Sequence, residues 1–532
     1  MQPQRLHLVC YYLTVSQMSK NLASKAVSGL KWGSVSTIAN AVMQIGYTSA
    51  MARLLAPEAF GLVAIAGVIL RFGSYFAHLG LSQAIIQKDE LTEENIRAAF
   101  TSSALLGLAF TVLIWVLAPF ATLFFENEVY ASEQVTPIVR LMSLALLIGG
   151  LSSTASSLCE RNMRFKELSI VETLSYVISY LGVGIILAYL DYGVWSLVIA
   201  TLTQAALVAL GAYFIARHSI LPLFKWESYK PLFNYGSKMS VISFLEFLSQ
   251  DMATILIGKT LGPYKLGIYD RAHRLVNLPM YMLTRTISRV IFPSFSKLQA
   301  ETSKLANAYI SSTTLLATII IPTCLGLLVA APEVVYILLG DQWGDSIPVL
   351  QVLCLAIPLS FITMFAGIVC DAKAVLNLKI VLTLVFIGVI TGFFFLLRQY
   401  GLVGFAFAIL AGELVRILFY QTVLNRILKL SYTRQLQVYI PGLVNGLIIA
   451  AAIYALSTVL RGAGLSHVLV LGAQIATGAV LFIALTLFFP HKTLKSQINT
   501  LLSKLGIDEN PTSYYGRLIS KYRKTVINST EG

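Results

Sequence analysis

Charge is scarce in this sequence. Only 12% of its 532 residues are Asp, Glu, Lys or Arg, whereas 57% are hydrophobic and the mean hydropathy is +0.76. A soluble domain averages about 25% charged residues, so this chain has too few to cover a water-facing surface of its size. The scarcity of charge excludes a soluble enzyme and an intrinsically disordered chain.

Cysteine pairs and nucleotide-binding motifs are also missing. The chain has five cysteines, with no CxxC pair and no metal-ligand spacing among them, which indicates a reduced chain without a disulfide framework. It contains no GxxxxGK[ST] pattern of the kind that cradles ATP phosphates. We therefore expect no cofactor, no metal site and no ATP-driven pump within this chain.

Long apolar runs are what the sequence has instead. About fourteen stretches reach the roughly 20 residues that a transmembrane helix needs. They lie at 32–52, 61–82, 98–122, 138–158, 168–189, 193–215, 236–258, 267–291, 308–330, 347–370, 376–397, 401–424, 438–459 and 465–489. Because these runs are about twice as long as a barrel strand and lack its alternation, they predict an all-α integral membrane protein.

The basic excess predicts how the chain is oriented. It has 39 Lys and Arg against 25 Asp and Glu. With the N-terminus placed in the cytoplasm, 27 of the 39 fall on the cytoplasmic side, five on the opposite side and seven within the apolar spans. This asymmetry predicts that both termini lie in the cytoplasm. The positive balance thus reflects membrane orientation, and no nucleic-acid partner is expected.

The two halves of the chain resemble each other at a spacing of 206–211 residues. The matches, in collinear order, are Leu55-Ala56-Pro57 with Leu261-Gly262-Pro263, Gly61 with Gly267, Pro137 with Pro348, Cys159-Glu160 with Cys370-Asp371, and Tyr192-Gly193 with Tyr400-Gly401. A duplicated unit of six helices places both copies in the same membrane orientation, as a parallel repeat. Two such lobes around a central cavity are typical of a transporter.

The repeat predicts a domain organisation. A cytoplasmic N-terminal segment precedes an N-lobe, a cytoplasmic linker and a C-lobe, followed by two accessory helices and a cytoplasmic tail. The predicted ranges are 1–31, 32–215, 216–235, 236–424, 425–489 and 490–532.

Four arginines lie on one face of the predicted helix 267–291. At about 100° per residue, they form a stripe about 60° wide; they are Arg271, Arg274, Arg285 and Arg289. A charge at the bilayer centre costs roughly 2.5–3.5 kcal/mol on the insertion scale. Snorkelling or pairing within the protein is one explanation. A stripe that lines a water-filled path is the one we favour.

The repeat-related helices also have polar faces. Arg71, Tyr75 and His78 share a face of 61–82, Asn40 and Gln44 lie on one stripe of 32–52, and Gln250 and Asp251 lie on 236–258. Together, the polar faces of these helices carry a net positive charge, which predicts an anionic substrate rich in hydroxyl groups. The predicted substrate-binding residues are Arg71, Arg271, Arg274, Arg285, His78, Tyr75, Asn40, Gln44 and Gln250.

Three of the acidic residues within the apolar spans of the second half are informative, namely Glu246, Asp251 and Glu413. Asp251 and Glu246 are candidate ion-coupling carboxylates for H⁺ or Na⁺, and structural pairing of Asp251 with the arginines of 267–291 is equally expected. Glu413 and Arg416, three residues apart on one helix, predict a structural ion pair.

Several motifs carry a family resemblance. KAVSGLKW at 25–32, RLLAPEAFGLVA at 53–64, the stretch 79–94, YGVW at 192–195, IGK at 257–259, LGIY at 266–269, RA at 271–272 and SRVIFP at 288–293 resemble Wzx-type polysaccharide transporters of the WzxC/TuaB-like branch. The resemblance covers roughly residues 19–430. It implies the fold of the multidrug/oligosaccharidyl-lipid/polysaccharide (MOP) exporter superfamily, the export of lipid-linked glycans and a location in the bacterial cytoplasmic (inner) membrane. This branch often has Asp at the position of Ala253, whereas this chain has Asp251.

The leading hypothesis is a flippase that moves an anionic, undecaprenyl-pyrophosphate-linked oligosaccharide across the membrane by alternating access. Its expected partners are this glycan, membrane lipid, H⁺ or Na⁺, and other polysaccharide assembly proteins. A multidrug cation exporter would need acidic inner faces, and a membrane glycosyltransferase would need larger outer loops. A non-transporting component of an assembly complex is the remaining alternative.

Overall fold

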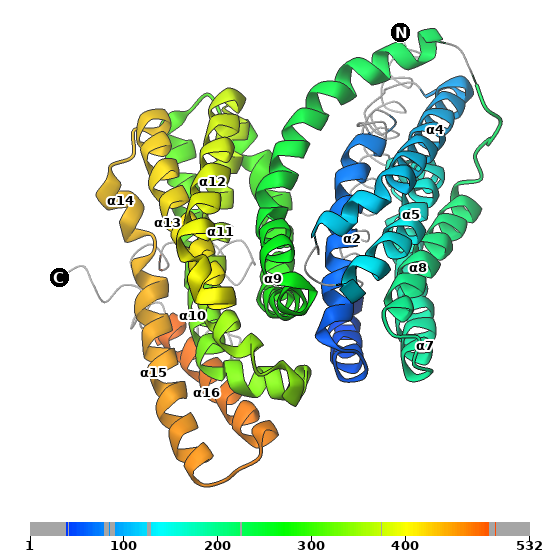
Figure 1. The fold of residues 1–532 in the computed structure, drawn as a ribbon. Helices are drawn as coiled ribbons and strands as arrows, with labels where there is room; N and C mark the ends of the chain where they lie inside the picture. The colour runs from blue at the N-terminus through cyan, green and yellow to red at the C-terminus, as the bar shows by residue number, and fades with distance from the viewer. Residues whose placement is uncertain are drawn as a thin grey trace, which may run out of the picture. The chain divides into compact units, whose positions relative to one another are not determined.

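A computed structural model describes residues 39–40, 42–78, 85, 91–124, 129–223, 226–373, 375–488 and 495. Every regular element in these ranges is a helix, and no strand occurs among them (Figure 1). The predicted all-α fold is confirmed.

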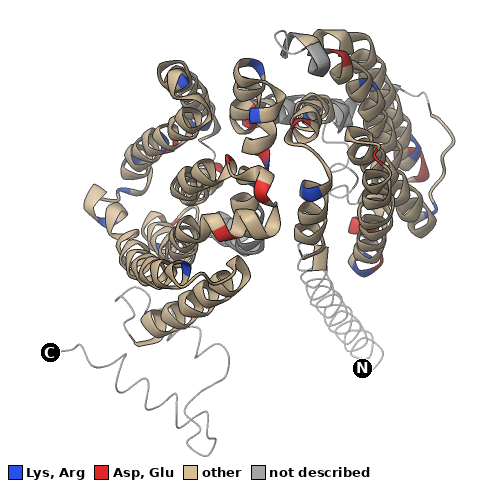
Figure 2. Cartoon of the chain, turned by 60° about the horizontal axis from the view of Figure 1, so that its bottom comes forward, with Lys and Arg blue, Asp and Glu red and all other residues tan. Residues whose placement is uncertain are grey.

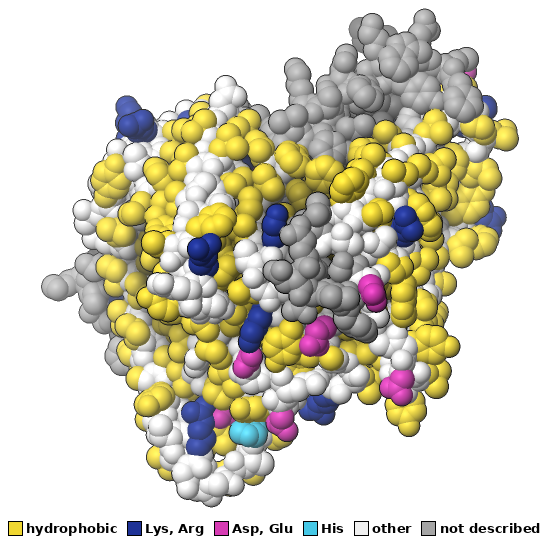
Figure 3. Space-filling model, in the orientation of Figure 1, with side chains coloured by type: hydrophobic (Ala, Val, Ile, Leu, Met, Phe, Trp, Pro, Cys, Tyr) yellow, Lys and Arg dark blue, Asp and Glu magenta, His cyan; other side chains and the backbone are white. Residues whose placement is uncertain are grey.

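Ten candidate membrane spans lie in the described part of the chain. One of them, Asn377–Leu428, joins two predicted helices, and the others each match a single predicted span. Much of the visible surface is hydrophobic (Figure 3), and large apolar side chains such as Val459 and Ile475 are more than half exposed. Exposed apolar surface on this scale requires lipid as the solvent, so the chain is a multi-pass membrane protein.

The chain forms two compact units, Met1–Asp270 and Arg271–Gly532. The first unit begins, among the described residues, with helical residues 39–40 and 42–54. It continues with α2 (Pro57–His78), α4 (Glu93–Leu117), the 3₁₀ turn η1 (Ala118–Phe124), α5 (Val129–Arg161), α6 (Phe165–Tyr176), the π-helical segment η2 (Val177–Gly184), α7 (Ile185–Tyr189) and α8 (Val194–Ala216). Helix α5 is central, because it packs against α2, α4 and α8.

Helix α9 (Trp226–Lys297) crosses from the first unit into the second. Its helical geometry is broken at Gly262, where φ is 78° and ψ is 179°. A residue with a Cβ disfavours this backbone conformation, so glycine is suited to the break. The two segments of α9 on either side of Gly262 contain the predicted spans 236–258 and 267–291.

The second unit continues with helices that pack around α10. They are α10 (Thr302–Leu338), η3 (Asp341–Trp343), α11 (Ser346–Ala372), α12 (Leu376–Leu397), η4 (Arg398–Tyr400), α13 (Gly401–Leu428), α14 (Tyr432–Gln437), α15 (Ile440–Gly462) and α16 (His467–Phe488). Helix α10 packs against α11, α15 and α16, and α13 packs against α11 and α12. The predicted accessory pair, α15 and α16, is therefore attached to α10 (Figure 1).

The backbone repeats an unusual conformation in the two halves. Gly193, before α8, has φ 55° and ψ −132°, and Gly401, at the start of α13, has φ 60° and ψ −146°. These glycines are the repeat mates predicted from the two Tyr-Gly pairs. The matching conformation supports the duplication, while the exact lobe boundaries stay a prediction.

Candidate functional site

An ion pair joins α2 to the first segment of α9. Arg71 donates from Nε to Oδ2 of Asp251 over 3.0 Å, and a second guanidinium nitrogen binds Oδ1 of the same carboxylate. The Asp251 side chain is 12% exposed, whereas that of Arg71 is 47% exposed. Charged side chains are sparse among the described helices (Figure 2), so a bidentate pair between two apolar helices is a feature that needs explanation.

Close packing of α2 on α9 positions this pair. Near the start of α2, Ile65 lies so close to Gly258 that a Cβ there would be 2.7 Å from its Cδ1 atom. Further along, the Phe72 ring lies 6.1 Å from Phe247, and the Tyr75 ring lies 5.6 Å from Phe247. Because residue numbers rise along α2 as they fall along α9, the two helices run antiparallel and bring Arg71 to Asp251.

The pair lies within the candidate membrane span of α2, Pro57–Tyr75, four residues before the end of that span. Arg71 is fourteen residues after Pro57, which is about 20 Å along a helix axis. The hydrocarbon core of a bilayer is about 30 Å thick. The carboxylate of Asp251 satisfies the guanidinium of Arg71 within this span.

The structure gives Asp251 a partner that the sequence did not predict. We expected structural pairing, if any, with the arginines of 267–291, but the carboxylate binds Arg71 of α2. Sequence reasoning places residues on helix faces. It cannot show which two faces of different helices meet.

The other predicted site residues are spread over several elements. Asn40 and Gln44 are half-buried in the helix before α2, and Glu246 is half-buried on α9, while Gln250 is exposed next to Asp251. In the second unit, Arg271 is buried and Arg274 is exposed, although only three residues separate them on α9. The side chains of His78, Arg285 and Arg289 lie outside the described residues. The structure therefore brings Arg71, Tyr75 and Asp251 into one cluster and leaves the full arginine stripe a prediction.

The predicted structural pair on α13 is present. Arg416 donates to Glu413 over 3.2 Å, and its guanidinium lies 5.0 Å from the centre of the Phe386 ring. Glu413 is buried, with an exposed fraction of 5%. This pair joins α13 to α12 through the aromatic contact, and it has the structural character that its spacing predicted.

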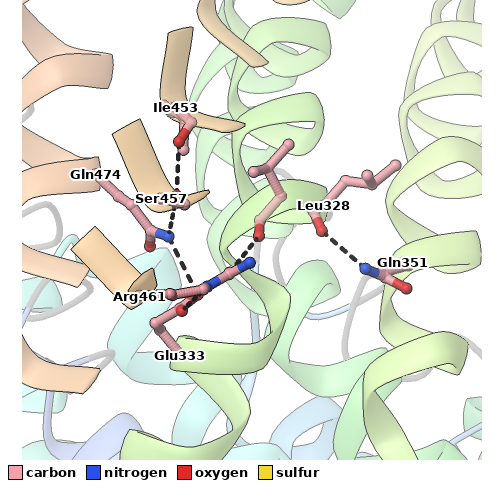
Figure 4. A network of polar contacts seen from close by, with 8 residues as sticks. Leu328, Glu333, Gln351, Ile453, Ser457, Arg461 and Gln474 are labelled. Carbon is pink, nitrogen blue, oxygen red and sulfur yellow. Dashed lines mark hydrogen bonds and ion pairs between the residues drawn. The ribbon is translucent and has the colours of Figure 1, made fainter. Parts of the chain in front are cut away.

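A second buried network was missed from the sequence (Figure 4). Glu333 of α10 is fully buried and accepts from Arg461 of α15 over 2.7 and 2.8 Å, and from Gln474 of α16 over 3.1 Å. Gln474 also donates to Ser457 over 2.8 Å. Glu333 and Arg461 lie beyond the ends of the predicted spans 308–330 and 438–459, but the structure places both in helices. The polar residues Ser457 and Gln474 within two apolar spans were the available signal.

One known protein family matches a large part of the chain. A family model described as "Polysaccharide biosynthesis protein" matches residues 50–348, which is more than half of the chain. The chain belongs to this family. The matched region runs from before α2 to the start of α11 and includes both residues of the Arg71–Asp251 pair.

Two relatives are each similar to 63% of the chain. The lipopolysaccharide biosynthesis protein WzxC of Escherichia coli (strain K12) is 24% identical, with 63% of this chain and 67% of that protein aligned. The teichuronic acid biosynthesis protein TuaB of Bacillus subtilis (strain 168) is 24% identical, with 63% of this chain and 68% of that protein aligned. The resemblance to the WzxC/TuaB-like branch is confirmed.

Solved structures show the same fold. The lipid II flippase MurJ in an inward closed conformation aligns with a TM-score of 0.70 and 14% identity, over 86% of this chain and 98% of its own. An inward-facing multidrug resistance MATE family transporter of the MOP superfamily aligns with a TM-score of 0.59 and 19% identity, over 74% of this chain and 99% of its own. The chain thus has the MOP fold, and two proteins with different substrates share it.

Proposed function

We propose that the chain is a flippase for an anionic lipid-linked oligosaccharide of the undecaprenyl-pyrophosphate type, or a related glycan. Membership of the polysaccharide biosynthesis family supports a glycan as the substrate, and the MOP fold supports transport. The observation that favours an anionic glycan over a multidrug cation is the half-exposed arginine, Arg71, within the apolar span of α2.

Arg71 keeps donors for a substrate while it is held in place. A guanidinium has five N–H groups in a rigid fork, and the two hydrogen bonds to Asp251 use two of them. The remaining donors suit the oxygens of a phosphate or a uronic acid. In the proposed mechanism, the pyrophosphate or an acidic sugar binds Arg71 while the lipid tail stays in the bilayer.

Asp251 sets when Arg71 can bind an anion. A carboxylate beside the guanidinium competes with the substrate for it, so the cation is most available when Asp251 is neutralised by H⁺ or Na⁺, or has moved away. Glu246 lies five residues earlier on α9 and is the second candidate for this coupling role. Arg271, Arg274, Arg285, His78, Asn40, Gln44 and Gln250 remain proposed members of the substrate path.

Tyr75 lies beside the cation and supplies a face for a sugar ring. Its ring is 5.6 Å from that of Phe247, on the same side of α2 as Arg71, one turn further along. Aromatic faces pack against the apolar faces of sugars, and the hydroxyl group adds a hydrogen bond.

The orientation and location belong to the same proposal. The distribution of Lys and Arg supports a cytoplasmic location of both termini, and the bacterial relatives support the bacterial cytoplasmic (inner) membrane as the site of transport. A net negative head group that moves outward is favoured by an inside-negative potential, by about 2.3 kcal/mol per elementary charge per 100 mV. A coupling ion is then needed chiefly to reset the carrier.

Substitution of Arg71 tests the proposal. We expect Arg71→Ala to lower surface glycan per molecule of inserted protein by about tenfold or more, which corresponds to about 1.4 kcal/mol. Arg71→Lys should rescue export partly, because it keeps the charge and loses the fork. Surface glycan is measured by immunoblot and normalised to the amount of the protein in the membrane.

The control is Arg140→Ala, which removes a guanidinium that donates to the carbonyl oxygen of Trp115 on α4. It should leave export within about twofold of the unsubstituted chain, as expected for a structural arginine. Normal export by Arg71→Ala would overturn the proposal for this site. Normal glycan export by every arginine variant, together with loss of export in a strain without the chain, would favour a non-transporting component instead.

A further inference from the structure

The two repeats contain the same short motif at the start of corresponding helical segments. Proline is followed four residues later by glycine in both, as Pro57 and Gly61 at the start of α2, and as Pro263 and Gly267 directly after the break in α9. The copies are 206 residues apart. All four residues lie in the first compact unit.

The copies pack against each other reciprocally. A Cβ placed on Gly61 would lie 2.7 Å from the carbonyl carbon of Pro263, and a Cβ placed on Gly267 would lie 2.7 Å from the carbonyl carbon of Pro57. Each would also overlap the carbonyl oxygen of that proline. Only glycine allows backbones to approach this closely. We call this contact the glycine–proline seam.

Reciprocity identifies the local symmetry. In a two-fold contact, residue i of one copy meets residue j of the other, and j of the first meets i of the second. The seam follows this rule, with proline against glycine on both sides. A parallel repeat has its pseudo-two-fold axis along the membrane normal, so the seam lies on that axis where the two motifs meet.

Close glycine packing also occurs within a single repeat. A Cβ on Gly107 of α4 would lie 2.7 Å from the carbonyl oxygen of Leu146 on α5. These two helices belong to one repeat and pack as neighbours within it. The glycine–proline seam instead joins one repeat to its mate, which is where a duplicated carrier must part.

The seam covers the ion pair from the predicted outer side. Both motifs follow outward connections in the predicted orientation, and Arg71 lies ten residues after Gly61 on α2, about 15 Å further into the membrane. Gly262, with its φ of 78°, directly precedes Pro263. A break at this point allows the following segment of α9 to move as a body about a hinge.

We propose that the glycine–proline seam is the outer gate of the transport cycle, closed in this structure, and that it parts when the substrate leaves. The inference rests on the proposed function and orientation. The seam is made of Cα and carbonyl groups, so parting it loses dispersion contacts and weak C–H···O contacts and leaves no buried charge unpaired. The missing methyl groups at Gly61 and Gly267 keep the closed state accessible.

A buried reporter beside the seam tests this inference. Ile65 is one turn after Gly61, is fully buried and contacts Gly258 of α9. In a chain whose five native cysteines are replaced by alanine, the thiol introduced by Ile65→Cys is labelled from outside with a membrane-impermeant maleimide. We expect Gly61→Ala and Gly267→Ala each to speed labelling about tenfold, since an added methyl disfavours closure; this equals about 1.4 kcal/mol.

Two controls accompany the measurement. Gly46→Ala adds a methyl group where nothing lies within 4 Å and should leave labelling unchanged. Tyr192→Cys, at a residue 53% exposed in a predicted outward connection, should be labelled at once and thereby checks the orientation. If the carrier opens outward, Ile65→Cys should also be labelled slowly in the chain with both glycines intact. This measurement tests the gate even if the glycine variants fail to insert into the membrane.

Labelling that is the same in Gly61→Ala, Gly267→Ala and Gly46→Ala would overturn the gate, as would complete protection of the introduced thiol in the chain with both glycines intact. Faster labelling with only one of the two glycine substitutions would show that the two sides of the glycine–proline seam do not act reciprocally. The readout needs no glycan, so the seam can fail while the flippase proposal holds, and the reverse.

Discussion

Arg71 and Asp251 show at the residue scale what an apolar environment requires of a charge. Within a span of α2, the guanidinium is stable because a carboxylate from α9 binds it through two hydrogen bonds. The pair is asymmetric in exposure, with Asp251 nearly enclosed and Arg71 half open. This asymmetry indicates two roles. Asp251 holds the guanidinium in place, and the exposed part of Arg71 can still bind an anion.

The energetic coupling of the pair can be measured directly. A double-mutant cycle with Arg71→Ala and Asp251→Ala should give a coupling energy of about 0.5–3 kcal/mol in thermal unfolding in detergent. We expect the lower half of that range, because solvent screens the half-exposed guanidinium.

The matched cycle combines Asp251→Ala with Arg140→Ala, whose guanidinium donates to the carbonyl oxygen of Trp115. That cycle should be additive. Additivity in the Arg71 cycle would mean that the two groups do not stabilise each other, which would contradict the role of Asp251 as the group that holds Arg71 within the membrane.

At the residue scale, the sequence predicted which helix faces are polar. It did not predict which residues of different helices form a pair. The polar faces containing Arg71 and Asp251 followed from helical periodicity, and the spacing of Glu413 and Arg416 identified a pair within one helix. Asp251 and Arg71 are 180 residues apart, and no local pattern links them. Only the antiparallel packing of α2 on α9 does.

At the scale of elements, the accessory helices are attached by a buried polar network. Glu333 of α10 binds Arg461 of α15 and Gln474 of α16. Close packing adds to it, since a Cβ on Gly446 of α15 would lie 3.2 Å from Cα of Pro322 on α10. The α15–α16 hairpin is thus fixed to α10 by polar and apolar contacts together.

Glu333→Gln should weaken this attachment. The amide keeps the shape and loses the charge that Arg461 and Gln474 donate to, so we expect a loss of about 1–3 kcal/mol in the free energy of unfolding. The measurement is thermal unfolding of the purified chain in detergent.

Lys304→Ala is the control, because its ion pair with Glu301 has side chains that are 63% and 53% exposed. Such pairs contribute about 0–1 kcal/mol. Equal stability of Glu333→Gln and Lys304→Ala would show that the hairpin is held without the network.

Hydropathy predicted the helices well and their ends less well. The apolar windows matched the ten candidate spans, yet the window that ended at residue 330 missed that α10 continues to Leu338. A charge such as Glu333 lowers the hydropathy of a window and marks it as a loop. When a buried partner neutralises that charge, the helix continues, and the sequence alone gives no sign of it.

At the scale of the whole molecule, the scarcity of charge and the internal repeat were the strongest signals. The scarcity of charge predicts a membrane protein, and the exposed apolar side chains of the described surface are consistent with this. The second paired Tyr192-Gly193 with Tyr400-Gly401 and Pro57 with Pro263, and the structure shows matching backbone angles at the first pair and reciprocal contact at the second. Duplication is visible in sequence because it preserves turn-forming and close-packing residues, which tolerate little change.

The most direct test of the central claim is the fate of the lipid-linked precursor when the chain is absent. The gene is deleted in its native host, and the membrane pool of pyrophosphate-linked oligosaccharide and the surface glycan are measured together. We predict that one surface glycan disappears while its lipid-linked precursor accumulates, and that the intact chain restores both, whereas Arg71→Ala does not. An unchanged precursor pool with a normal set of surface glycans would contradict the account.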